Sequence, residues 1–306
     1  MKNYSWAHVH FYSKGIDGNV IFYTRHDYLV FLTLFCSIAK RKKKKILAFC
    51  IMPNHFHYLE LTTDGDTAIK SMAEFERQFA KIYNREYGRT GKSLFIKKSG
   101  KAIKATGKLV KSCIIYIYNN PTAGKLSKTS EEYRWNLIAY RNSAHPFSEK
   151  LNMSTARKAL RDSINMVNTI HDSGSYLSYA ALRRLFLKLN EDEAEQLTDY
   201  IIYRYDITDY DEINKIFGSP DNAVAASKAV AGSEYDIAED FENHSLYGAM
   251  AEEMERCRYN VNCRNIEALN ADEQKVLLRN LYERTHAPLR QLMKFLHISP
   301  VEGKSL

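Results

Sequence analysis

The sequence is poor in the features that mark linkers, membrane spans and secreted scaffolds. Only 6 prolines and 13 glycines occur among 306 residues, so long flexible linkers are not expected. No apolar run approaches the ~20 residues that a membrane-spanning helix needs. Residues 1–12 lack the basic-then-apolar order of a signal peptide. The 5 cysteines are odd in number and scattered, which excludes a small disulfide scaffold and favours the reducing cytoplasm.

Charge is divided unequally along the chain. Residues 1–150 contain 26 Lys and Arg against 11 Asp and Glu, a net charge of +15, whereas residues 151–306 contain 18 against 25, a net charge of −7. The run of six cations at residues 40–45 is, by itself, typical of a solvated helix end. The basic half as a whole, with its many aromatic residues, predicts nucleic-acid binding, because a basic body concentrates polyanions. We therefore expect two domains, a basic one over 1–150 and an acidic one over 151–306, in a cytoplasmic, nucleoid-associated protein.

Hydrophobic periodicity in the basic half predicts an α+β fold. The expected strands are residues 7–12, 46–52 and 55–61. The expected helices are residues 26–40, 67–87 and 106–120. The nearly continuous apolar run of the second strand indicates a buried central strand, paired antiparallel with the third. Pro121 is expected to end the last helix, and residues 93–105 are typical of a loop or hairpin. This order predicts an antiparallel sheet with helices packed on one face.

The acidic half is expected to be all-α. Its expected helices are residues 156–170, 179–189, 191–205, 209–217, 219–231 and 271–283. Residues 277–296 also resemble the first two helices of a helix-turn-helix, whose next helix would enter the major groove of DNA. Residues 301–306 are too few to complete that helix, so the segment could equally be a closing amphipathic helix.

The sequence MPNHFH over residues 52–57 carries the sharpest chemical signal. On a strand, side chains alternate between the two faces, so His55 and His57 share one face while Phe56 points into the core. Two imidazoles ~6.6 Å apart along a strand can bind one metal ion if another element supplies a further ligand. A His-x-His pair by itself is more often structural, and its position after a Pro-Asn break in a basic domain favours the metal site. Cys257 and Cys263 are a weaker metal candidate, because no second pair accompanies them.

A second group of functional side chains lies in the helix that precedes Pro121. Tyr116 and Asn120 are four residues apart and therefore share a helix face, whereas Tyr118 is rotated ~200° from Tyr116. A tyrosine near a divalent cation can attack a phosphate that the cation polarises. Tyr116 is therefore the candidate nucleophile, and Asn120 offers an amide oxygen to the metal. The commoner role for one of 21 tyrosines is packing on a sheet.

Taken jointly, these motifs resemble the single-tyrosine HUH transposases, in particular their REP-associated tyrosine transposase branch. The resemblance rests on His-Phe-His after Met-Pro-Asn and on Tyr-Ile-x-x-Asn-Pro about sixty residues later. It extends over roughly residues 5–145. Additional marks are the opening His8-Val9-His10, the Ser-Leu-Phe segment at 93–95 and Trp135.

The resemblance implies an HUH/RRM-like catalytic domain that cleaves and rejoins single-stranded DNA, often beside a hairpin, through a 5′-phosphotyrosine intermediate. It assigns the nucleophile to Tyr116 and the metal ligands to His55, His57 and Asn120, with Mg²⁺ or Mn²⁺ as the ion. A lysine-rich segment before the nucleophile helix is expected to contact DNA through Lys97, Lys98, Lys101 and Lys104. A homodimer is left open. Two alternatives also remain, a domesticated nucleic-acid-binding regulator with an idle site and a hydrolytic metallonuclease that uses an activated water.

Overall fold

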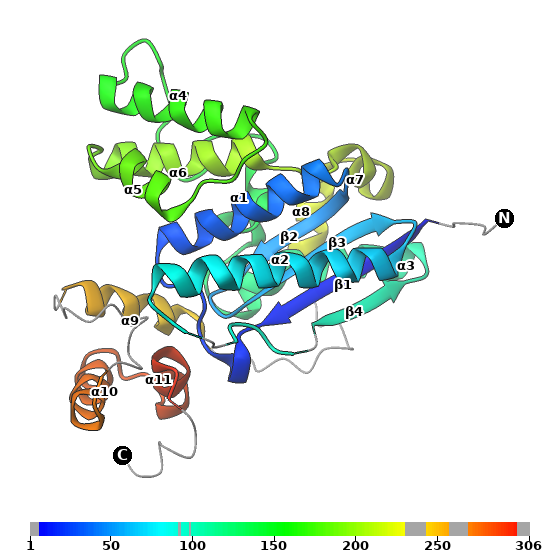
Figure 1. Ribbon diagram of the computed structural model, residues 1–306. Coiled ribbons are helices and arrows are strands. Elements are labelled where there is room, and N and C mark those ends of the chain that lie inside the picture. Colours follow the sequence, from blue (N-terminus) through cyan, green and yellow to red (C-terminus); the bar gives the residue numbers. More distant parts are fainter. Residues whose placement is uncertain (1–5, 91–92, 98, 230–242, 257–268, 299–306) are drawn as a thin grey trace.

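The computed structural model describes residues 6–90, 93–97, 99–229, 243–256 and 269–298. At its centre lies a four-stranded antiparallel sheet of order β2-β3-β1-β4 (Figure 1). The strands are β1 (Ala7–Lys14), β2 (Lys45–Ile51), β3 (His55–Thr62) and β4 (Gly100–Lys104). The α+β class and the antiparallel sheet are therefore confirmed. No helix within these ranges has both the length and the apolar character that a membrane span requires.

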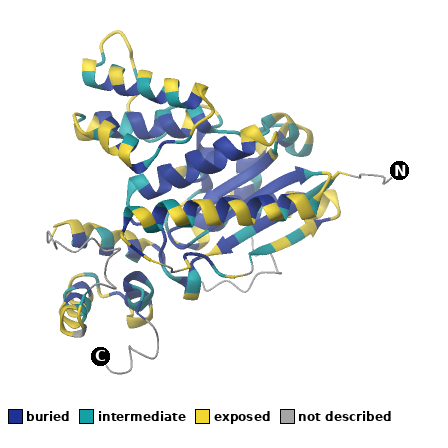
Figure 2. Cartoon of the chain, in the orientation of Figure 1, coloured by how far each residue is buried: buried dark blue, intermediate teal, exposed yellow. Residues whose placement is uncertain are grey.

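Helices cover both faces of the sheet. The three that contact it first along the chain are α1 (Arg25–Arg41), α2 (Gly65–Glu86) and α3 (Gly107–Ala123). The first two pack on one face over an aromatic core around Phe31, Phe56 and Phe79. Figure 2 shows β2, β3 and the middle of α1 buried, whereas β4 is largely exposed. On the other face α3 packs against β2, β3 and β4. The expectation that helices pack on one face alone is thus corrected. The side chains of β2 are apolar on both faces of the sheet, so both faces have to be buried under helices.

The apolar strand β2 is also an edge strand rather than the central one. Its outer edge is covered by irregular segments instead of a fifth strand. Ile51 donates its backbone N–H to Trp135 at 3.0 Å, and Asp209 donates to the carbonyl of Ile46 at 2.7 Å. These segments form hydrogen bonds with backbone groups at the edge of β2 and bury that edge. An edge strand can therefore have the apolar composition of a central strand here.

Pro121 lies inside α3 and does not end it. The helix continues to Ala123, and Gly124 and Leu126 donate back to the carbonyls of Asn120 and Pro121. A proline near a helix end removes only one internal hydrogen bond. Asn120 therefore keeps its helical position one turn after Tyr116.

The second half of the chain is helical, as expected. Its helices are α4 (Lys158–Asp172), α5 (Tyr179–Phe186), α6 (Glu191–Tyr205), α7 (Tyr210–Phe217), α8 (Pro220–Ala229), α9 (Ser245–Arg256), α10 (Ala271–Thr285) and α11 (Leu289–Leu296). Figure 1 shows α4, α5 and α6 stacked on α1 at the upper left, and α9, α10 and α11 grouped at the lower left, near the end of β1. The sequence pattern did not predict α9.

The hydrophobic core does not stop at residue 150. Side chains from α4, α5 and α6 belong to the same buried cluster as α1 and the sheet. The buried Asp27 of α1 accepts hydrogen bonds from Tyr87 at 2.7 Å and from Tyr179 of α5 at 2.9 Å. The division into domains at residue 150 stays a prediction, and the packing across it is continuous.

A smaller core joins the last three helices to the loop that follows β1. Tyr23 donates to the carbonyl of Phe295 at 2.7 Å, and Val20 donates to that of Lys294 at 3.2 Å. The two helices α10 and α11 match the first two helices of the expected helix-turn-helix. The segment that would hold a third helix, and the pair Cys257 and Cys263, lie outside the described residues.

Candidate active site

The start of β3 and the last turns of α3 bring the predicted metal ligands together. His55 and His57 lie on the sheet face that α3 covers, and their ring centroids are 5.0 Å apart. The Nε2 atom of His55 lies 3.1 Å from the Oδ1 atom of Asn120. Two residues that are 65 positions apart in sequence thus place a ring nitrogen and an amide oxygen side by side.

Both ring nitrogens of His55 face oxygen acceptors. Nδ1 lies 2.7 Å from the Oδ1 atom of Asn54, and Nε2 faces Asn120 as described. Both amides are fixed in orientation, because Asn54 donates through Nδ2 to the carbonyl of Gly18 and Asn120 donates through Nδ2 to that of Tyr116. A neutral imidazole has one N–H to donate. Only one of the two contacts can therefore be a hydrogen bond. At the other contact, most readily the longer one between Nε2 and Asn120, a nitrogen lone pair faces an oxygen lone pair.

The histidine stays neutral in this environment. Burial, with the nearby His244 and Lys14, lowers the pKa of His55 to about 3. A second proton therefore does not relieve the contact between Nε2 and Asn120 at neutral pH. A cation between the two atoms would relieve it, since two ligands at right angles around an ion ~2.1 Å away are ~3.0 Å apart. His55 and Asn120 thus fit a small divalent ion.

The second imidazole, His57, is held by a third histidine. His10 Nε2 lies 3.1 Å from His57 Nδ1, and the two rings stack at 5.2 Å. Burial and the adjacent rings of His55 and His10 lower the pKa of His57 well below its usual value. A neutral imidazole is the form that binds metal. Among the described residues, no three His, Cys, Asp or Glu side chains are grouped so that they could hold an ion by themselves. The amide of Asn120 and oxygen atoms of a substrate would have to complete the shell.

Tyr116 and Tyr118 occupy opposite sides of α3. The ring of Tyr116 meets those of His57 and His10 edge-on, at centroid distances of 5.4 and 5.8 Å. Tyr118 points away from these rings by helix geometry. Burial raises its pKa, and its hydroxyl makes no hydrogen bond with a described residue. The structure thus groups Tyr116, and not Tyr118, with the two histidines and Asn120.

Two further histidines belong to this site. His10 could have been found from sequence, because the alternation that pairs His55 with His57 also places His8 and His10 on one face. His244 precedes α9, and its ring lies 5.6 Å from that of His55, while its backbone N–H donates to the carbonyl of Gly124. No local pattern around residue 244 links it to residue 55, so only the tertiary structure shows this contact.

The four predicted DNA-binding lysines do not form one surface. Lys97 is exposed, Lys98 lies outside the described residues, and Lys101 is exposed and 3.3 Å from Asp66 of α2. Lys104 is only 5% exposed and lies opposite His8, on the face that carries the histidines. Lys101 and Lys104 both belong to β4, and positions three apart on a strand point to opposite faces. The expected contact of these lysines with DNA stays a prediction.

The described part of the fold can be compared with known proteins. No protein-family model and no curated protein matches the chain. Among solved structures, it is similar to that of a REP-associated tyrosine transposase bound to a REP hairpin, with 15% sequence identity and a TM-score of 0.38. The similarity covers 46% of this chain and 82% of that chain. A likeness at this level carries no information on chemistry, so function has to be inferred from the side chains around His55.

Proposed function

We propose that this protein is a metal-dependent DNA strand transferase of the transposase type, which cleaves single-stranded DNA with Tyr116 as the nucleophile and then rejoins it. One observation carries the proposal. A ring nitrogen of His55 and the Oδ1 atom of Asn120 face each other at 3.1 Å, and the Tyr116 ring lies against His57 on the same side of the sheet. A cation site and a hydroxyl nucleophile therefore lie together within a basic half of the chain.

His55, His57 and Asn120 are the proposed ligands of a Mg²⁺ or Mn²⁺ ion. Two imidazoles alone would suit zinc or copper better, so the amide oxygen and DNA phosphate oxygens supply the harder ligands that these ions prefer. When bound, such an ion polarises the phosphate and neutralises charge that develops on it. His10 acts as a positioning residue, because its contact with His57 Nδ1 fixes the orientation of that ring.

In the proposed reaction the phenolic oxygen of Tyr116 forms a bond to the phosphorus of a DNA phosphodiester, and the bond from phosphorus to the 3′ oxygen breaks. The phenol loses a proton and the leaving 3′ oxygen gains one, so the step is balanced. The products are a 5′-phosphotyrosine and a free 3′-hydroxyl. Attack by a 3′-hydroxyl on the tyrosyl ester reverses the step and rejoins DNA. The ester conserves the bond energy, which agrees with the lack of a glycine-rich phosphate loop in the sequence.

The proposed substrate is a single strand or a hairpin, the latter being what the similar solved structure holds. Tyr116 is 5% exposed and Asn120 is 4% exposed, between the sheet and α3. One backbone has to reach this narrow position, and a rigid duplex is too wide to do so. Because these two residues are almost fully buried, we also expect His244, which contacts His55, to move when DNA binds.

A denaturing gel tests the proposal. The full chain is incubated with Mn²⁺ and labelled single-stranded DNA from the flanks of its own gene, with the same DNA fully paired as the control. A labelled protein band that resists denaturation is the expected result, stronger with the single strand. Cleaved DNA without that band would show a hydrolytic metallonuclease. Bound but uncleaved DNA would show a regulator with an idle site.

A further inference from the structure

A cavity opens at the N-terminal end of α3, away from Tyr116 and Asn120. It lies near the face of the sheet that carries the histidines. It has a volume of about 700 Å³ and lies between the ends of β1 and β4, the first turn of α3 and α7. The lining residues that matter here are Trp6, His8, Ile103, Lys104, Lys111 and Lys215. The mechanism above uses none of them.

The lining is cationic. Lys104 is 5% exposed and so keeps its ammonium within the fold beside the cavity. Lys111 of α3 makes no ion pair within the described ranges, and its Nζ lies 5.7 Å from the centre of the Phe217 ring. Lys215 pairs with Glu212 at 2.8 Å, so part of its charge is neutralised. Lys111 thus leaves positive charge at one wall of the cavity, and Lys104 lies beside it.

The first turn of α3 adds to this charge. Thr106 caps the helix by accepting from the N–H of Leu109 at 3.3 Å, and Gly107 begins it. Apart from its chain neighbours and its own helix backbone, no atom of the described residues lies within 4 Å of the point where a Cβ of Gly107 would sit, so the backbone there is open to close approach. The N-terminus of a helix favours anions, because its N–H groups point outward and the helix dipole is positive there.

An apolar surface borders the same cavity. Trp6 is 59% exposed and Ile103 is 63% exposed, which is unusual for such large side chains. Lys45 lies over the Trp6 ring with its Nζ 5.4 Å from the ring centre, which holds the indole at this end of the sheet. An exposed aromatic ring beside lysines is the arrangement with which proteins bind single-stranded nucleic acid.

The cavity is lined by the same strand and the same helix that carry the candidate active site. His8 at the cavity and His10 at the site are two residues apart on one face of β1, a rise of ~6.8 Å. Val110 at the cavity precedes Tyr116 by six residues of α3, a rise of ~9 Å.

We propose that this cavity binds a flanking nucleotide of the DNA strand that Tyr116 cleaves. Its phosphate lies against Lys104, Lys111 and the first turn of α3, and its base stacks on Trp6. The inference rests on the proposed function. It adds a second contact between the protein and the cleaved strand, and this contact sets the position of the cleaved phosphate.

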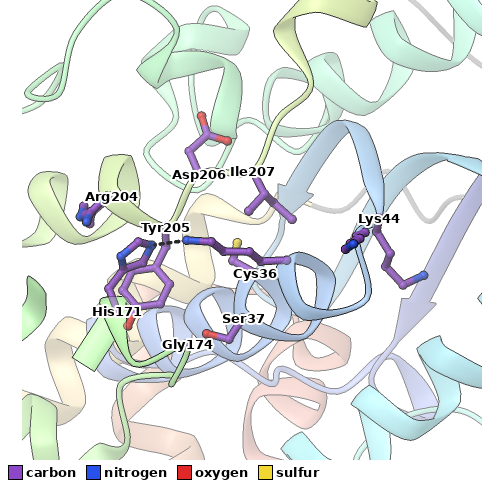
Figure 3. A pocket seen from close by; sticks show the side chains of 11 residues that line it. Cys36, Ser37, Lys44, His171, Gly174, Arg204, Tyr205, Asp206 and Ile207 are labelled. Carbon is purple, nitrogen blue, oxygen red and sulfur yellow. Dashed lines mark hydrogen bonds between the residues drawn. The ribbon is translucent and has the colours of Figure 1, made fainter. Parts of the chain in front are cut away.

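Another basic cavity, drawn in Figure 3, provides the control. It has a volume of about 450 Å³ and lies between α1, α4 and α6, on the far side of the sheet from Tyr116. Two of its four cations are neutralised, since Lys44 pairs with Glu60 and Arg204 pairs with Asp172, both at 2.6 Å. Lys40 lies at this cavity and bonds His171 at 3.4 Å. Lys40→Ala therefore removes the same charge as Lys111→Ala at a place where we expect no DNA.

Fluorescence anisotropy of a labelled single strand from the gene's flanks, measured in EDTA over a range of salt, tests the inference. We expect Trp6→Ala to raise Kd about 5- to 100-fold with an unchanged salt dependence. Lys111→Ala should raise Kd and reduce the slope of log Kd against log salt by ~0.7. Lys40→Ala should stay within about twofold of the wild type, and melting curves confirm that all three variants fold.

Equal weakening by Lys111→Ala and Lys40→Ala would overturn the inference, as would wild-type affinity in both Trp6→Ala and Lys111→Ala. The two proposals fail separately. A wild-type protein that forms the covalent band while these variants bind normally would refute only the cavity. The expected binding pattern without any covalent band in the wild type would refute only the strand-transfer chemistry.

Discussion

Consecutive residues of β3 point to opposite faces of the sheet and meet very different surroundings. Phe56 and Tyr58 pack with Phe31 and Phe35 against α1, in a core of stacked and edge-on rings. His55 and His57, on the other face, meet Asn120 and Tyr116 of α3. One strand thus holds an apolar core and a polar site at once. The core fixes the backbone of the strand, and the rigid backbone fixes the two imidazoles, so stability and chemistry should respond to different substitutions.

The largest contrast is expected between two tyrosines of one helix. Tyr116→Phe removes one oxygen from the candidate site and should reduce the covalent DNA adduct below detection, while DNA binding persists. Tyr118→Phe removes a hydroxyl that makes no hydrogen bond with a described residue and should retain the adduct within a fewfold of the wild type. Adduct yield on a denaturing gel checks both. Loss of the adduct in Tyr118→Phe but not in Tyr116→Phe would reverse the assignment.

Neighbouring residues of β3 should separate stability from activity. Phe56→Ala leaves a cavity in the aromatic core and should lower the free energy of unfolding by ~3–5 kcal/mol. His57→Ala should abolish cleavage and lower the melting temperature much less, because its ring packs in the site rather than in that core. Urea unfolding and the gel assay measure the two properties. A His57→Ala protein as unstable as Phe56→Ala would show that the two faces are not separable.

Metal binding should stabilise only proteins with an intact site. A ligand at a hundred times its Kd adds ~2.7 kcal/mol to the folded state. Saturating Mn²⁺ should therefore raise the melting temperature of the wild type by a few degrees. His55→Ala and Asn120→Ala should lose this shift, whereas His145→Ala, a partly buried histidine outside the site, should keep it. A shift that survives in both site variants would place the ion elsewhere.

The smallest effect concerns the N-terminal end of α3, which faces the cavity lined by Trp6 and Lys111. Thr106→Ala removes the hydroxyl that caps Leu109 and should destabilise the protein by ~1 kcal/mol. Adduct formation should stay within a fewfold of the wild type, because the proposed phosphate contact uses the lysines and the helix backbone, which this substitution leaves in place. Chemical denaturation gives the first value and the gel gives the second. A complete loss of adduct at unchanged stability would mean that this end of the helix takes part in the chemistry.

The sequence predicted what depends on short-range geometry. The period of two on β3 placed His55 and His57 on one face, and the helical spacing placed Tyr116 with Asn120. The pairing of these two elements came from the family resemblance and not from any local pattern. The buried residues Tyr247, Met250 and Met254 of α9 also follow a helical period, so that helix was within reach of the same reasoning.

What the sequence could not supply depends on tertiary contacts. An apolar run indicates burial but not position in the sheet, so β2 was expected at the centre although irregular segments bury its edge. Lys104 belongs to a cation-rich segment, and only the register with β1 shows that it turns inward beside His8. The contact of His244 with His55 joins residues 189 positions apart, and nothing near either one encodes it.

The central claim is that the chemistry resides on the face where His55, Asn120 and Tyr116 meet. Peptide mapping of the trapped protein–DNA adduct by mass spectrometry tests it most directly. We predict a single nucleotide-bearing peptide with the phosphate on Tyr116. A phosphate on Tyr118 or on any other residue would contradict the account, because no other tyrosine of α3 shares the helix face of Asn120.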